Sequence, residues 1–228
     1  PEFIVERRDR LAGLVLTHAH EDHLGAVPYL WERLRCPIYA TPFTLSILRR
    51  KLAETDFADE IEIIEVPLSG RFTVGPFDME LITLTHSIPE PNAIAIRTEL
   101  GTVLHTGDWK FDPDPVIGDT ADLDALERLG DEGVLALVCD STNVFTPGES
   151  GSEADLLDSL VDVIGECRGR VAVACFATNV ARPETIARAP AAHPRDWRLA
   201  GRSFVRPTRR APPTRPPEGP ASLPARAH

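Results

Sequence analysis

Short apolar runs alternate with stretches of helical spacing along most of the chain. Residues 11–17 form an apolar run that ends at a polar cluster, which predicts a buried strand. Residues 24–35 carry apolar side chains at helical spacing, with Pro28 in the first turn, where proline is tolerated. The same criteria predict further strands at 37–40, 61–66, 134–139 and 170–176, and helices over 41–54 and 152–167.

Two hairpins are predicted in the middle of the chain. Gly75-Pro76 is a turn signal between strands at 71–74 and 77–84. A further pair of strands, at 93–98 and 102–106, is predicted around Leu100-Gly101. Strands therefore outnumber helices, with β-α-β alternation toward both ends. This pattern favours an α/β fold in which helices cover two sheets, a layered sandwich.

The end of the chain differs in composition. From Pro183 onward it holds ten of the 21 prolines, together with nine Arg and three acidic residues. Proline-rich sequence without a hydrophobic pattern does not form an interior strand or helix. We therefore expect residues 207–228 to be a disordered Pro/Arg-rich tail. The abrupt change motivates the hypothesis that this tail is an out-of-frame or prematurely ended reading.

Net charge is distributed unevenly along the chain. The total of −11 combines +6 from Pro183 onward with −17 over residues 1–182. A body this acidic is not typical of a nucleic-acid binder, but acidic side chains near a site also suit divalent cations. The charge balance alone therefore does not decide the partner.

The length of 228 residues and the 43% hydrophobic content fit one sizeable domain, or one domain with part of another. No apolar run approaches the ~20 residues that would span a bilayer, and no leader pattern opens the chain. We therefore expect a cytoplasmic protein without membrane contact. The four scattered cysteines include no C-x-x-C pair, so neither a disulfide nor a structural zinc site is expected from them.

The strongest chemical signal is a cluster of histidines after the first predicted strand. His18, His20, Asp22 and His23 fall within six residues. A loop at a strand end can aim such side chains at one point. Imidazole and carboxylate are the usual ligands of zinc, and an Asp beside a His allows two adjacent metals. The alternative is a solvated polar loop, but three of the seven histidines lie here, which favours a metal site.

Four motifs together resemble the metallo-β-lactamase superfamily. His-x-His-x-Asp-His at 18–23, followed by Leu24-Gly25, is similar to the signature of that superfamily. Thr-His-Ser-Ile-Pro at 85–89 and Thr-Gly-Asp-Trp-Lys-Phe-Asp at 106–112 resemble its later metal-binding segments. Cys-Asp-Ser-Thr-Asn at 139–143 resembles the first motif of its β-CASP subgroup. Over residues 1–206 the combination looks most like bacterial ribonuclease J.

This resemblance implies a two-zinc ribonuclease. The ligands, carried over by position, are His18, His20 and His86 for one zinc, Asp22 and His23 for the second, and Asp108 as the bridge. Asp22, Asp108 and Asp140 would take part in catalysis, with Asp140 supporting proton transfer. The implied activity is hydrolysis of RNA phosphodiester bonds as a 5′-to-3′ exonuclease and endonuclease, in RNA processing and decay. RNA is the implied partner, and homo-oligomers are possible for a full-length protein.

Several of these residues have a structural alternative when taken alone. A single His such as His86 is more often structural, Asp108 completes a common Gly-Asp turn pair, and Asp140 could cap a helix or form an Asx-turn. Positions after predicted strands favour the metal role of His86 and Asp108. Three other histidines are given no part in the site: His105, which is expected to be structural, His193 and His228.

The match to this family is expected to be incomplete at both ends. Only ten residues precede residue 11, where the family has about two strands, so we expect an N-terminally incomplete αββα sandwich over 1–176. Residues 177–206 resemble only the beginning of a β-CASP domain. The first zinc would have four ligands and the second only three, which predicts incomplete zinc binding and weak or absent RNA cleavage.

Two other functions are carried as alternatives. The first motif is shared with other hydrolases of this fold, such as thioesterases, lactonases and tRNA 3′-end nucleases, although the 139–143 motif argues against them. The incomplete ends favour instead an inactive metal-binding fragment. Assays on RNA, a thioester and a lactone, with and without chelator, distinguish the three.

Overall fold

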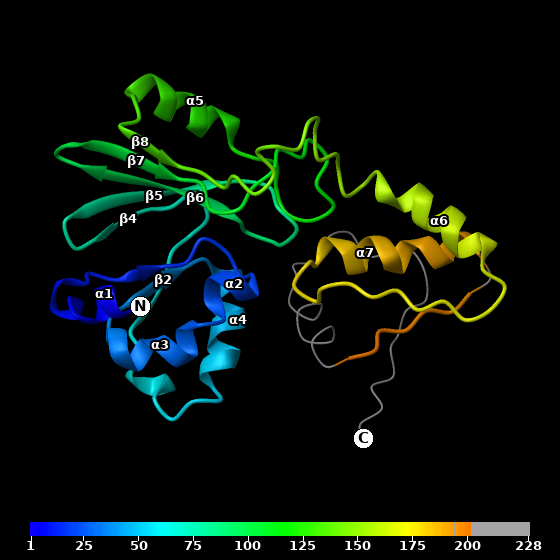
Figure 1. The fold of residues 1–228 in the computed structure, drawn as a ribbon, viewed down its shortest axis with the longest axis horizontal. Helices are drawn as coiled ribbons and strands as arrows, with labels where there is room; N and C mark the ends of the chain where they lie inside the picture. Colours follow the sequence, from blue (N-terminus) through cyan, green and yellow to red (C-terminus); the bar gives the residue numbers. More distant parts are fainter. Residues whose placement is uncertain (194, 202–228) are drawn as a thin grey trace.

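The computed structural model describes residues 1–193 and 195–201 (Figure 1). The predicted tail at 207–228 lies outside these ranges, as do residues 194 and 202–206 of the predicted β-CASP beginning. The helices are α1 (Glu2–Val5), α2 (Glu21–Leu24), α3 (Val27–Leu34), α4 (Pro42–Leu52), α5 (Leu123–Glu132), α6 (Leu156–Glu166) and α7 (Ala181–Arg188), with the 3-10 turns η1 (Arg8–Arg10), η2 (Ala58–Glu60) and η3 (Ala189–Ala192). The strands are β1 (Leu14–Val15), β2 (Ile38–Ala40), β3 (Ile63–Glu65), β4 (Arg71–Val74), β5 (Phe77–Thr83), β6 (Asn92–Thr98), β7 (Gly101–His105) and β8 (Ala136–Val138).

These strands form two sheets. The first is parallel throughout, with the order β1-β2-β3, and its register pairs Leu14 with Ile38 and Ile38 with Ile63. The second has the order β4-β5-β6-β7-β8, in which β4 to β7 form an antiparallel meander and β8 lies parallel to β7. Figure 1 shows the second sheet above the first, and a cluster of buried side chains lies between them.

Three clusters of buried side chains separate the layers. The first lies between the parallel sheet and helices α3 and α4, and it includes Ile38 and Leu45. The second lies between the two sheets and includes Val74 and Ile94. The third packs the outer face of the second sheet against α5 through Leu129. The resulting order of helix, sheet, sheet and helix confirms the predicted αββα sandwich.

Alternation along β5 explains how one strand serves two of these clusters. Met79 and Leu81 belong to the cluster between the sheets, whereas Ile82 belongs to the cluster under α5. Successive side chains of a strand point to opposite faces of its sheet. Because both faces are covered, the strand is apolar on both sides at its C-terminal end, and its position was predictable from the apolar run.

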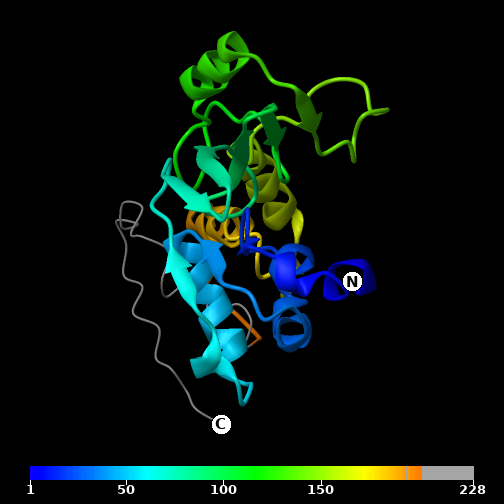
Figure 2. The same ribbon diagram turned by 90° about the vertical axis from the view of Figure 1, so that its left-hand side faces the viewer.

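Helices α6 and α7 pack against each other and against η3, beside the sandwich (Figure 1). In Figure 2 the two sheets stand in front of them. Val180, just before α7, reaches the cluster beneath the parallel sheet. Helix α6 precedes the predicted domain boundary at 176/177 and α7 follows it, yet the two are in contact. The boundary itself stays a prediction.

Four predicted elements differ from the structure. The prediction of a strand at 170–176 is wrong: these residues are not paired with any strand of the two described sheets. The predicted helix over 24–35 corresponds to α3, which begins at Val27, three residues later than expected, and a separate short helix, α2, precedes it. Helix α6 begins at Leu156, four residues later than expected. Strand β1 has only two residues, since the chain leaves the sheet early to form the histidine loop.

Helix α5 was not predicted, although its sequence carries helix signals. The carboxylate of Asp122 accepts a hydrogen bond of 3.0 Å from the N–H of Ala125, which caps the helix. Leu126 and Leu129 lie at helical spacing and pack on the second sheet. Helix α7 was also missed, because Pro183 in its first turn was assigned to the proline-rich end of the chain.

Candidate metal centre

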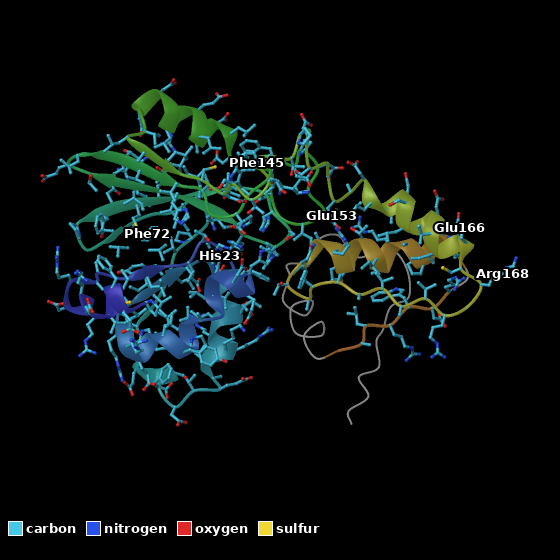
Figure 3. All side chains as sticks on the ribbon, in the orientation of Figure 1. His23, Phe72, Phe145, Glu153, Glu166 and Arg168 are labelled. Carbon is cyan, nitrogen blue, oxygen red and sulfur yellow. The ribbon has the colours of Figure 1, made fainter. Side chains whose placement is uncertain are left out.

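The predicted ligands gather at one end of the sandwich, where strands of both sheets terminate. The loop after β1 and helix α2 carry the cluster at 18–23, His86 follows β5, and Asp108 follows β7. Figure 3 shows His23 at the end of the sandwich that is nearer α7. Sheet pairing therefore brings together side chains that lie far apart in the sequence.

Three imidazoles and one carboxylate form the first donor group. His20 Nδ1 lies 3.1 Å from His18 Nε2 and 3.1 Å from His86 Nε2. His86 Nε2 lies 3.9 Å from Asp108 Oδ2. The four donor atoms all lie within 4.8 Å of one another, which is a spacing that ligands of one cation can adopt.

A second donor group shares Asp108 with the first. His23 Nε2 lies 3.3 Å from Asp108 Oδ1 and 3.6 Å from Asp22 Oδ2. The donor atoms of Asp22, His23 and Asp108 again lie within 4.8 Å of one another. Asp108 therefore faces both groups, one with each carboxylate oxygen.

The histidines of the first group are held in their neutral form. Burial, followed by the nearby imidazoles of His23, His20 and His86, lowers the pKa of His18 to about 2. Burial and the neighbouring His86 lower the pKa of His20 to about 4, and burial also lowers the pKa of His86. Neutral imidazoles keep the nitrogen lone pairs that a metal ion requires, so the chemistry of this donor set fits a cation.

Two hydroxyl groups hold imidazoles of the cluster from behind. Thr17 Oγ1 lies 3.0 Å from His18 Nδ1, and Ser87 Oγ lies 3.3 Å from His20 Nε2. Each contact occupies the ring nitrogen that faces away from the donor group and so orients the ring. Sequence reasoning missed these roles, although each hydroxyl residue lies directly beside a predicted ligand.

Gly107 sets the direction of the chain just before Asp108. Its φ of +59° lies in the left-handed region, and a Cβ there would come within 3.1 Å of Asn92 O and Thr17 Cβ. The Asn92 side chain donates hydrogen bonds to Thr17 O and to Glu90 O. The loop ahead of Asp108 therefore packs closely against the strand end that carries His18.

Asp140 lies beside the donor groups and is not a member of either. Its N–H donates a 3.0 Å hydrogen bond to Thr106 Oγ1. A hydrogen bond from the N–H of Thr142 lowers the pKa of Asp140, and the N–H of Trp109 and the nearby His86 lower it further, against the opposing effect of burial. Asp140 is thus a carboxylate anion at neutral pH, close to a ligand of the first group.

Two histidines that were given no part in the site have contacts elsewhere. His105 Nδ1 accepts a hydrogen bond of 3.1 Å from the N–H of Gly107, which is a structural contact. His193 Nε2 lies 2.8 Å from the carbonyl oxygen of Val161, on α6. His228 lies outside the described residues.

The sequence of this chain is similar to a known protein family and to individual known proteins. The sequence profile of the metallo-beta-lactamase superfamily matches residues 2–209. Ribonuclease J of Sinorhizobium meliloti is 46% identical over 204 residues, which cover 90% of this chain and 36% of that protein. Ribonuclease J of Corynebacterium glutamicum is 43% identical over 209 residues, covering 90% of this chain and 29% of that protein.

A solved structure shares the fold. A protein of unknown function from Enterococcus faecalis V583 superposes with a TM-score of 0.54 at 20% identity, covering 77% of this chain and 44% of that one. The coverages of the two ribonucleases J show that the chain spans about a third of the length of those proteins. On the profile match and the shared fold, the chain belongs to the metallo-β-lactamase superfamily.

Proposed function

We propose that this chain carries the catalytic metal centre of a zinc-dependent ribonuclease that hydrolyses RNA phosphodiester bonds. The observation that carries this proposal is the convergence of His18, His20, His86 and Asp108 on one point, with Asp108 shared by a second group. The similarity to ribonucleases J supports RNA as the substrate.

The donor set favours zinc. Imidazole nitrogen with carboxylate oxygen, in groups of three or four ligands, is a usual zinc environment. His18, His20, His86 and Asp108 would hold the first ion, and Asp22 and His23 with the shared Asp108 would hold the second. When bound, two such ions lower the pKa of water toward neutrality and neutralise phosphate oxygens.

The protein's own groups contribute position and charge. Asp108 can tie the two sites at a fixed separation because its two oxygens face different groups. Thr17 and Ser87 fix the orientation of His18 and His20, so little reorganisation is needed during the reaction. The anionic Asp140, held near His86, would support proton transfer through a histidine other than the metal ligands, as the resemblance implies.

We further infer that the substrate is cut both from its 5′ end and internally, with a 5′-phosphate on the product. The protein would act in the cytoplasm, where RNA is processed, and a full-length protein could form homo-oligomers. Of the helices in the described part of the chain, none is long and apolar enough to cross a bilayer.

The test uses the 228-residue chain with 5′-monophosphorylated RNA, a thioester and a lactone, each with and without chelator, alongside metal analysis. Weak RNA cleavage that chelator abolishes and zinc restores is the expected result, because the second donor group has only three ligands within the described residues. Asp108→Asn should remove it, whereas Asp78→Asn, a change in an exposed ion pair with Arg71, should not. Hydrolysis of the thioester or lactone alone would overturn RNA as the substrate.

Specific observations also favour one alternative, a non-catalytic metal-binding fragment. The second donor group has only three protein ligands within the described residues, and the chain spans about a third of its relatives. Zinc binding without hydrolysis of any of the three substrates would favour a non-catalytic metal-binding fragment. The metal analysis separates this outcome from a failure to bind metal.

A further inference from the structure

Asp112 is a buried carboxylate outside both donor groups. It follows Asp108 by four residues, and it is 4% exposed. Buried carboxylates are rare unless ion pairs and hydrogen bonds compensate for lost hydration. The Lys110 ammonium lies 2.9 Å from Asp112 Oδ2, and the N–H of Asp114 donates to Oδ1 at 3.1 Å.

These contacts keep Asp112 ionised. Burial alone would raise its pKa, but hydrogen bonds from Lys110 and from the N–H groups of Asp114 and Glu153, with the Ser152 side chain nearby, outweigh burial and lower the pKa. The carboxylate is therefore a fixed anion surrounded by donors.

On one side, the segment that carries Asp112 is joined to the strand end that carries His86. The N–H of Asp112 donates to Thr85 Oγ1 at 3.0 Å, and the N–H of Lys110 donates to Thr85 O at 2.9 Å. Thr85 Oγ1 also donates to the carbonyl of Lys110. Thr85 directly precedes His86, so these bonds set the distance between the ends of β5 and β7, which carry His86 and Asp108.

On the other side, the same segment is joined to the chain that leads to α6. The N–H of Glu153 donates to Asp112 Oδ2 at 3.3 Å, and Lys110 Nζ donates to Gly151 O at 3.3 Å. Ser152 Oγ donates to the carbonyl of Asp114 at 3.0 Å. Residues 151–153 are therefore joined to 110–114 by three hydrogen bonds.

Glu153 extends this connection to α7. Its carboxylate forms a two-pronged ion pair with the guanidinium of Arg182, in the first turn of α7. Figure 3 shows Glu153 between the sandwich and α7. One chain of contacts thus runs from His86 through Thr85 and Asp112 to Arg182.

We propose that Asp112 is a positioning residue that couples metal binding at the centre to the packing of α6 and α7 on the sandwich. The proposal rests on the metal centre of the proposed function. When metal binding restricts the motion of Asp108 and His86, the hydrogen bonds of Asp112 extend that restriction to residues 151–153. Such coupling is reciprocal. The factor by which metal binding strengthens the α6 and α7 contacts is therefore also the factor by which loss of those contacts weakens metal binding.

Hydrogen exchange of the full 228-residue chain, with and without zinc, tests the coupling. In the unchanged chain, zinc should increase protection of the amides at 151–153 and at Arg182. Asp112→Asn removes the negative charge and places an amide among donors. Zinc affinity should then fall about tenfold, which is typical when a group that supports metal ligands is lost. Zinc should also no longer increase the hydrogen-exchange protection of the amides at 151–153. Asp78→Asn serves as the matched control and should change neither.

Ser152→Ala is the second variant, in case Asp112→Asn does not fold. It keeps the carboxylate and should reduce zinc-dependent protection in the same direction by a smaller amount. Zinc-dependent protection and affinity that are unchanged in a folded Asp112→Asn would overturn the coupling. If the unchanged chain binds no zinc, the proposed metal centre is overturned. The hydrogen bonds between Asp112 and residues 151–153 are then still tested, because metal-free Asp112→Asn should lose hydrogen-exchange protection at the Glu153 amide.

Discussion

The Nε2 atom of His86 lies 3.1 Å from the Nδ1 atom of His20, although 66 residues separate them in the sequence. The pKa of each ring is lowered, so both imidazoles are neutral near pH 7 and each keeps one nitrogen with a free lone pair. Nitrogen atoms at this distance can share a hydrogen bond in the metal-free fold or bind one cation together. The fold therefore holds donor atoms of the first group close together before a metal ion binds.

Zinc should accordingly raise the free energy of unfolding. At a free zinc concentration of 100 times Kd, the expected gain is about 2.7 kcal/mol. Urea unfolding with zinc and with chelator measures it. His86→Ala removes one ligand of the first group and should lose most of the gain. An unfolding midpoint that does not respond to zinc in the unchanged chain contradicts the prediction.

The stability of the metal-free chain should depend on pH below neutrality. The folded chain holds the pKa of His18 near 2 and that of His20 near 4, against 6.5 for an unperturbed imidazole. Because the folded-state values are lower, the unfolded chain takes up protons first as pH falls. The contribution of both residues is complete above about pH 6.5 and is lost progressively toward pH 4, by about 1.4 kcal/mol per pH unit for each histidine.

Urea unfolding in chelator at pH 7 and at pH 5 checks this slope. His18→Asn should flatten it, since an amide does not titrate in this range. Equal unfolding free energies at the two pH values in the unchanged chain would show that the imidazoles are not buried in their neutral form.

Asp108→Asn should affect zinc stoichiometry more than Asp22→Asn does. Asp108 belongs to both donor groups, whereas Asp22 belongs only to the second. We expect Asp22→Asn to retain one zinc ion per chain and Asp108→Asn to weaken both sites. Metal analysis after dialysis, with titration calorimetry, measures the difference. Equal stoichiometry in the two variants contradicts a shared role for Asp108.

Gly107→Ala should destabilise the fold and weaken metal binding together. The left-handed φ costs a residue with a side chain about 1–2 kcal/mol, and the new Cβ would also press on Thr17 and Asn92. Gly118→Ala is the control, because its φ is +82° but no atom lies within 4 Å of the added Cβ. Thermal unfolding and zinc titration should show a loss of zinc affinity only for Gly107→Ala.

The layered fold could largely be predicted from the sequence because both sheets carry clear apolar patterns. Strand β5 alternates apolar and acidic residues over its first half, and its C-terminal end is apolar on both faces. The predicted strand at 170–176 shows the limit of this reasoning. Apolar composition favours burial, but a strand also requires a hydrogen-bonding neighbour, which a pattern does not reveal.

The candidate ligands were predictable to different degrees. The cluster at 18–23 is local and visible from spacing alone. His86 and Asp108 were expected only through the resemblance of their motifs, because β5, β6 and β7 must pair before the two meet. The supporting contacts of Thr17 and Asp112 depend on side-chain geometry and could not be predicted from spacing.

The same local cluster has a consequence for how the protein reaches its native state. His18, His20, Asp22 and His23 lie within six residues, so an unfolded chain also offers zinc several ligands. Zinc bound there stabilises the unfolded ensemble and holds these side chains in non-native arrangements, which opposes productive folding. Refolding should therefore be faster in chelator with zinc added at the end, and zinc present from the start should act as a kinetic trap.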